Sequence, residues 1–460
     1  MIKSILFVSL LLAGGSSWAV AQTDGNLQTM TLSELYTLAD QKSQKVKVSE
    51  VALQAADEGI EAAKSAMLPT VDLSLQGSYT GNAFMLSRGF STSGTTDYIV
   101  PGVGSIPVAN GKQPTPHWGN SFTAQVAQVV YAGGAIRSGI RMAELGKGLA
   151  ELDVEKNRQE VRFLLTGYYL DLCKLSNQME VVRQNIELTQ KVIAQMKARR
   201  EQGTVLQNDI TRYDYQLKNL ELTLKKLTDA SAIINHQLVT TLHLPEQTVI
   251  VPDKNEVNTD INALSAITTQ AAWQQKASDN NIGIRQAQVA SNLAAEKIKQ
   301  AKASLLPSVA VVAENQFYGP YTQDLIPKDC NVNVWFIGVG VKYSLGNIWK
   351  SKHQIRKARV EHQQSQETIS LAREGVEKAV QANYTNLLTS QTEVDTQKKQ
   401  VELAQQNYSV VQNRYQNDLV LLTDMVDASN MKLSAEMALV NARINMLYNF
   451  YRLKYVTNTL

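Results

Sequence analysis

The amino-acid sequence contains an internal duplication, and this feature restricts the possible folds more than any other. The segment 63–71, with Leu68-Pro69 inside it, recurs at 301–309 with Leu306-Pro307. Further on, the stretch from Val161 aligns without gaps to the stretch from Val376. The matched pairs include Tyr169 with Tyr384, Leu172 with Leu387, Arg199 with Arg414, and Asp209 with Asp424. Identities in fixed register over about sixty residues indicate an ancient duplication, so we expect two halves of similar structure.

Each half is predicted to contain a long helix that turns back into a shorter one. In the first half these helices cover about 134–202 and 207–241, and the second half repeats them from about 346 to 417 and beyond. Apolar residues recur at alternating spacings of three and four, the pattern of antiparallel coiled-coil packing. A helix of about 68 residues would be near 100 Å long. A further helix, about 31–67, precedes the strands of the first half.

Four segments alternate between apolar and polar residues and are predicted to be strands: 70–79, 121–131, 308–317 and 331–343. Runs of about ten residues with aromatic residues at their ends are typical of a transmembrane barrel, while a soluble sandwich is the alternative. Four strands cannot close a barrel, because the smallest have about eight. The barrel is therefore expected to be shared between subunits, with the segments 81–119 and 319–330 as loops.

The N-terminus has the three parts of a secretory signal peptide. Lys3 precedes a short apolar run, and Ala19-Val20-Ala21 provides a cleavage site after residue 21. The run is shorter than the ~20 residues that span a bilayer. A buried first helix is the alternative interpretation, and export is the expectation.

Composition gives no support to other classes of protein. The formal charge of +3 offers nothing to attract nucleic acid, and two distant cysteines cannot form a zinc site. A mean hydropathy of −0.21 argues against a polytopic helical membrane protein. Motifs of nucleotide-binding, metalloprotease or serine-hydrolase sites are missing from the sequence, so we expect no enzyme activity, no cofactor and no metal.

The order of these parts resembles the TolC-like outer-membrane efflux family over nearly all of the chain after the signal peptide. The resemblance rests on the duplicated order, both Leu-Pro strand entries, Met30-Thr31-Leu32-Ser33-Glu34-Leu35, and Leu421-Leu422-Thr423-Asp424-Met425-Val426-Asp427-Ala428. It implies an α+β membrane protein that forms a homotrimer. Each protomer would give four strands to a shared trimeric 12-stranded β-barrel in the outer-membrane lipid of a Gram-negative bacterium, and its long antiparallel coiled-coil helices to a periplasmic α-barrel.

The same resemblance implies a function and a division of the chain. The protein would be the exit duct of a tripartite export system, working with a periplasmic adaptor (membrane fusion protein) and an inner-membrane transporter. The parts would be a signal peptide (1–21), a first repeat (22–241), an equatorial linker region (242–281) and a second repeat (282–460). The alternatives are a periplasmic adaptor or scaffold protein, and a passive porin with a periplasmic extension.

Two carboxylates match the pore carboxylates of this family, Asp424 and Asp427. They are three residues apart on a predicted helix, so both can face one side. Three copies of each would give two rings of three negative charges at the narrow periplasmic end, which attract cations and repel anions. The alternative is that Asp424, with Thr423, only caps the start of the helix.

Tyr415 and Asp209 match two partners of the family's polar gate lock, in which a phenol donates to a carboxylate. The pattern departs from the family at Val420, where the best-known members carry a locking arginine. The lock is therefore Tyr415 with Asp209 alone, or it uses Arg212 or Arg414. By family analogy, the helix tips that would dock the adaptor are Gly203, Thr204, Val205, Asp418, Leu419 and Val420.

Overall fold

The computed structural model describes residues 26–81, 83–85, 96–100, 104–108, 111–113, 116–203, 205–253, 269–320, 329–417 and 419–460. The chain divides into two compact units. Unit 1 comprises Met1–Val48, Lys156–Asn280 and Val376–Leu460, and unit 2 comprises Ser49–Glu155 and Asn281–Gly375. Each unit thus contains parts of both sequence repeats. The predicted signal peptide lies outside the described residues, and the repeat boundaries stay a prediction.

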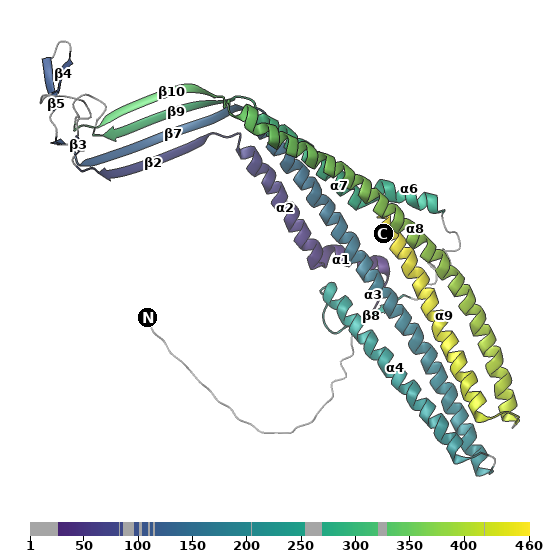
Figure 1. The fold of residues 1–460 in the computed structure, drawn as a ribbon. Coiled ribbons are helices and arrows are strands. Elements are labelled where there is room, and N and C mark those ends of the chain that lie inside the picture. The colour runs from purple at the N-terminus through teal and green to yellow at the C-terminus, as the bar shows by residue number, and fades with distance from the viewer. Residues whose placement is uncertain are drawn as a thin grey trace, which may run out of the picture. The chain divides into compact units, whose positions relative to one another are not determined.

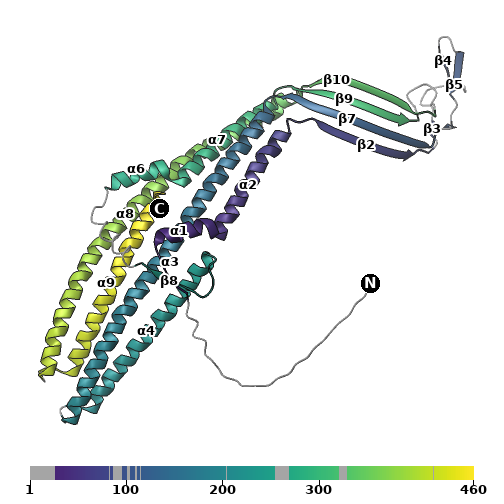
Figure 2. The same cartoon turned by 180° about the vertical axis from the view of Figure 1, so that it is seen from behind.

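The predicted helices of both hairpins are confirmed. The ends of α3 (Ala135–Glu201), α4 (Gln207–Thr241) and α8 (Asn347–Gln416) match the prediction to within a residue or two, and α9 (Leu422–Val456) is the helix predicted to follow residue 417. Within unit 1, α4 runs back beside α3 and α9 runs back beside α8, and both views show these two hairpins (Figures 1 and 2). Among the helices that the structure describes, none is long and apolar enough to cross a membrane.

The continuous helix predicted for about 31–67 is wrong, because the chain forms two helices there. These are α1 (Leu32–Lys42) and α2 (Gln44–Ser65), and Ser43 between them has an extended backbone with φ −60° and ψ 125°. Serine favours such a position at a helix start. The break lets α1 bury Leu32, Leu35 and Ala39, while the Thr31 hydroxyl accepts a hydrogen bond from the Glu34 backbone N–H. A matching pair, α6 (Gln270–Asn280) and α7 (Ile282–Ala303), begins inside the predicted linker region.

Unit 2 contains an antiparallel four-stranded sheet in the order β10-β9-β7-β2, which confirms the four predicted strands (Figure 1). The strands are β2 (Thr70–Tyr79), β7 (Trp118–Ala132), β9 (Ser308–Gly319) and β10 (Val332–Lys342). Leu73 of β2 is 69 % exposed and Ile337 of β10 is 70 % exposed, so the apolar face of the edge strands is uncovered in the single chain. The pairing register aligns Asp72, Gln125 and Glu314 on the opposite face.

Three short strand pairs add to what the sequence predicted. In the segment 81–119, predicted as a loop, β3 (Ala83–Met85) pairs with β6 (Gly111–Gln113) and β4 (Thr96–Val100) pairs with β5 (Gly104–Val108). In unit 1, β1 (Asn26–Met30) pairs in parallel with β8 (Thr248–Pro252). The Asn235 side chain on α4 makes two backbone hydrogen bonds to β8, to Thr248 O and from Ile250 N, each 2.8 Å.

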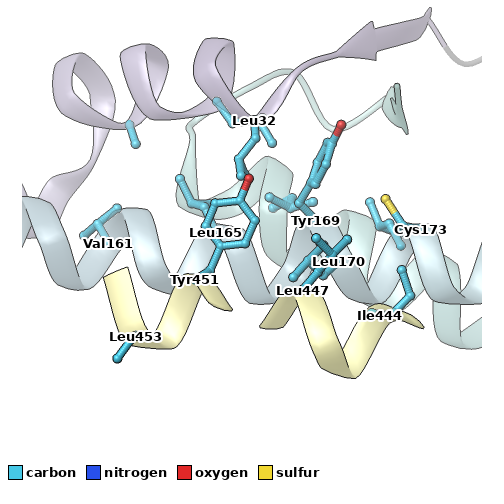
Figure 3. Close-up of a cluster of buried hydrophobic side chains, with 14 of the residues drawn as sticks. Leu32, Val161, Leu165, Tyr169, Leu170, Cys173, Ile444, Leu447, Tyr451 and Leu453 are labelled. Carbon is cyan, nitrogen blue, oxygen red and sulfur yellow. The ribbon is translucent and has the colours of Figure 1, made fainter. Parts of the chain in front are cut away.

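The main core of unit 1 lies where α1 packs against α3 and α9 (Figure 3). Leu35 and Leu165 are completely buried, as is Leu447 of α9. The Tyr36 hydroxyl lies 2.6 Å from the Thr166 hydroxyl, and Arg162 pairs with Asp40 at 2.5 Å. Apolar burial of this kind supplies most of the free energy that holds a surface helix in place.

Candidate functional site

Both helical hairpins of unit 1 turn within a few residues, where the sequence predicted the periplasmic tips. Gly203 closes the first turn with φ +77°, a conformation that glycine adopts at little cost, and its N–H donates to Arg200 O at 2.8 Å. In the second turn, the Leu419 N–H donates to Arg414 O at 2.9 Å. Of the predicted tip residues, Thr204 and Asp418 lie outside the described residues, while Val205 and Val420 are half-buried.

Exposed leucines lie at both turns, and two of them were not among the tip residues predicted from the sequence. Leu206 and Leu421 are matched positions of the duplication, each directly before a short helix, and both are more than 70 % exposed. Leu419 is 73 % exposed as well. The repeated pair Val-Leu before Asp209 and Asp424 was the signal that could have identified them.

Asp424 stabilises the first turn of α9 by a hydrogen bond in addition to carrying a carboxylate. It is the third residue of the helix, and its Oδ2 accepts a hydrogen bond from the Leu421 backbone N–H at 3.2 Å. Asp424 therefore stabilises the helix start, which is one part of the capping alternative. Asp424 and Asp427 are both exposed, while Leu422, Met425 and Ala428 are buried beneath them. The two carboxylates therefore share one solvent-facing side of α9, and their role in a pore stays a prediction.

Beneath the turns, a second apolar cluster contains residues of α3, α4, α8 and α9. Three tyrosines gather in it, namely Tyr213, Tyr408 and Tyr415. Tyr213 is 3 % exposed, and among the residues that the structure describes its hydroxyl has no hydrogen-bond partner. Burial raises the pKa of the Tyr213 phenol, and the neighbouring Tyr408 and Tyr415 raise it further. A cluster with a buried, unpartnered hydroxyl is a weak point in the packing of the tip.

Replacing Tyr213 by phenylalanine is expected to stabilise unit 1 by about 1 kcal/mol, because it removes a buried hydroxyl that lacks a partner. The pKa of this phenol in the folded protein lies above its ordinary value of 10.0. The stability of the wild type is thus fully present below pH ~10 and falls as the pH rises above it, whereas Tyr213→Phe loses less. Thermal unfolding between pH 8 and pH 11 measures both effects. Tyr215→Phe, at a site 70 % exposed, is the control, and equal pH dependence of the three proteins would contradict the prediction.

The predicted lock residues both lie at this end of unit 1. Tyr415, near the end of α8, lines a groove of about 460 Å³ together with Met196, Arg199 and Met425. Asp209 is half-buried in the first turn of α4, in the position that Asp424 occupies in α9. The hydrogen bond between Tyr415 and Asp209 stays a prediction.

The structure shows a set of polar contacts between the two hairpins that the sequence did not reveal. Gln216 of α4 donates to Asn430 of α9 at 2.6 Å, and Gln178 of α3 donates to Asn441 at 2.7 Å. The Asn185 side chain donates to Glu436 at 3.3 Å. The sequence showed only that these helix faces are rich in amides. Each contact joins residues that are more than 200 positions apart in the sequence, so periodicity alone could not pair them.

The described residues hold no group of three or more histidine, cysteine or acidic side chains arranged for a metal ion. Cys173 and Cys330 form no disulfide bond: Cys173 is buried in unit 1 and Cys330 is exposed. The chemistry of the tip is therefore that of carboxylates, phenols, amides and exposed leucines.

Comparisons with known proteins give a consistent result. The model of the family "Outer membrane efflux protein" matches residues 35–242 and 273–459. The outer membrane protein TolC of Salmonella enteritidis is 22 % identical over 466 residues, covering 99 % of this chain and 86 % of that protein. The structure of VceC from Vibrio cholerae has a TM-score of 0.68 at 15 % identity, covering 93 % of this chain and 95 % of VceC. The open state of the MtrE outer membrane channel of Neisseria gonorrhoeae has a TM-score of 0.68 at 14 % identity, covering 93 % and 88 %.

Proposed function

Because the chain belongs to the outer membrane efflux protein family, we propose that it is the outer-membrane exit duct of a tripartite export system. The family match over both halves carries this proposal, and it sets aside the alternative of a periplasmic adaptor or scaffold. The duct conducts small molecules or polypeptides from a pump in the inner membrane to the exterior. The family is one of efflux proteins, and the residues of the tip serve passage and gating rather than catalysis.

The sheet of unit 2 supports a trimer. Its edge strands are β2 and β10, and four strands are about half the number that the smallest barrels need. Pairing of β10 with β2 of a neighbouring copy, repeated three times, closes a 12-stranded barrel. Leu73 and Ile337, with the other apolar side chains on their face of the sheet, would then face lipid, and Asp72 and Glu314, on the other face, would face water.

Membrane fractionation tests the duct against the adaptor. The protein is expected in the outer-membrane fraction, resisting extraction and running as a heat-stable trimer. A monomer in the soluble periplasmic fraction would contradict the proposal. The better interpretation would then be that the protein is a periplasmic adaptor.

The periplasmic end is the gate in this proposal. Asp424 and Asp427 form two rings of carboxylates around the narrow opening, and the lock of Tyr415 with Asp209 holds the hairpins closed. The exposed Leu206 and Leu421, together with Leu419 and the other predicted tip residues, present the apolar surface on which the periplasmic adaptor docks.

The double variant Tyr415→Phe/Asp209→Ala is expected to raise single-channel conductance several-fold, since it removes the lock from all three protomers. A hydrogen bond to a charged group contributes about 1.5–3 kcal/mol, and symmetry triples it. Planar-bilayer recording measures the conductance. The matched control is Tyr215→Phe/Asp214→Ala, which changes the same residue types at exposed positions of α4. Conductance unchanged from wild type in the lock variant would rule out this lock.

A further inference from the structure

A second groove of unit 1 lies between α3 and α9, with a volume of about 520 Å³. Its walls carry four aromatic rings, those of Phe163, Tyr168, Tyr448 and Tyr455. The rings of Phe163 and Tyr455 stack with their centroids 4.7 Å apart and an angle of 16° between their planes. The rings of Phe163 and Tyr448 lie 5.5 Å apart at 38°. The groove thus presents a preformed set of ring faces and edges, the surface against which a further flat ring packs well.

The groove opens on the side of α3 that α1 does not cover. Leu165 and Tyr169 point into the core beneath α1 (Figure 3). The groove residues of α3 include Phe163, Leu164, Gly167 and Asp171, which at 100° per residue lie on the opposite face of the helix. Leu164 is 44 % exposed, so this face of α3 is accessible to solvent in the single chain.

Gly167 forms a hollow in the floor of the groove. A Cβ atom at this position would meet nothing within 4 Å apart from the helix's own backbone. Glycine in the middle of a 67-residue helix costs about 1 kcal/mol relative to alanine, so the helix itself gains nothing from it. The missing side chain leaves room for a flat molecule to approach the backbone of α3.

The charged groups of the groove are already paired. Asp171 pairs with Lys174 at 2.6 Å, and Glu160 pairs with Lys45. Burial, and then the nearby Glu160, raise the pKa of the Tyr455 phenol, which therefore stays neutral at physiological pH. With the carboxylates neutralised and the phenols uncharged, the groove offers aromatic faces and hydrogen-bonding hydroxyls rather than a net charge.

We propose that this groove binds uncharged planar aromatic molecules of the size of a fused two-ring system. The inference rests on the proposed function and deepens it, because it assigns the face of α3 opposite α1 to the lumen of the duct. The groove would then be a transient binding site for aromatic solutes that pass through the helical part of the channel. Each protomer would contain one such site.

The test uses 2-naphthol, an uncharged two-ring phenol at neutral pH, and the full-length trimer in lipid nanodiscs. Equilibrium dialysis against protein-free nanodiscs measures the binding. Wild type is expected to bind three molecules per trimer. Gly167→Phe fills the hollow and is expected to weaken binding at least about tenfold, the contribution of one or two ring contacts. Gly375→Phe is the control, because Gly375 also lies within a long helix and its Cβ would also meet nothing within 4 Å, at an exposed site outside the groove.

Two results would overturn the proposal. One is equal binding of 2-naphthol by wild type and Gly167→Phe, with both proteins running as trimers. The other is tighter binding of 1-naphthylmethylammonium or 1-naphthoate than of 2-naphthol, which would mean that the site selects charge. Conductance of the same samples separates this inference from the proposed function. Channels without naphthol binding would refute only the groove, and binding without channels would refute only the duct.

Discussion

Replacing Asp424 and Asp427 together by asparagine is expected to remove most of the cation selectivity of the channel. Three protomers would bring six carboxylates to the narrow end, and two unit charges 4 Å apart interact by about 1 kcal/mol even in water. Loss of about 1.4 kcal/mol corresponds to a tenfold change in the ratio of cation to anion permeability. Reversal potentials in asymmetric potassium chloride, recorded in planar bilayers, measure this ratio directly.

Asparagine is the informative substitution because Asp424 also holds the first turn of α9. An asparagine side-chain oxygen can still accept the hydrogen bond from the Leu421 N–H, so the variant loses charge and keeps the helix start. The control is Glu201→Gln/Asp214→Asn, which removes two exposed carboxylates from the other hairpin. A channel whose selectivity survives the Asp424 and Asp427 changes would show that the carboxylates serve only the helix. Selectivity lost equally in the control would point to the net charge of the whole tip.

Replacing Leu165 by alanine is expected to lower the free energy of unfolding of unit 1 by about 2–5 kcal/mol. The side chain is completely buried where α1 packs on α3 and α9, so its removal leaves a cavity among side chains that cannot all move inward (Figure 3). A natural protein has a stability of about 5–15 kcal/mol, so this is a large fraction of it. Chemical denaturation, followed by the circular dichroism of the helices, measures the loss.

The adjacent Leu164→Ala makes a close control. It deletes the same atoms from the same helix, at a side chain that is 44 % exposed, and is expected to cost less than about 1 kcal/mol. Equal destabilisation by the two substitutions would contradict the assignment of the core to the face of α3 beneath α1.

The sequence was sufficient for the elements whose signals are local. The alternating three and four spacing predicted α4 and the two long helices to within a residue or two, because a helix buries one stripe at a fixed period. Glycine at position 203 marked the first turn, since it adopts a positive φ that other residues avoid. Alternation predicted the four long strands, and the duplication predicted that a helix like α4 would follow the second long helix.

The tertiary structure decided everything that depends on which distant surfaces meet. The break at Ser43 allows α1 to bury its apolar side on α3 and α9, a choice set by the partner and not by the helix. The parallel pairing of β1 with β8 and the contact of Gln216 with Asn430 join segments far apart along the chain. Periodicity reports which face of an element is buried, and it carries no information on what buries it. That information arises only when packing and hydrogen-bond satisfaction are solved for the whole chain at once, which is why the aromatic groove over Gly167 became visible only in the folded protein.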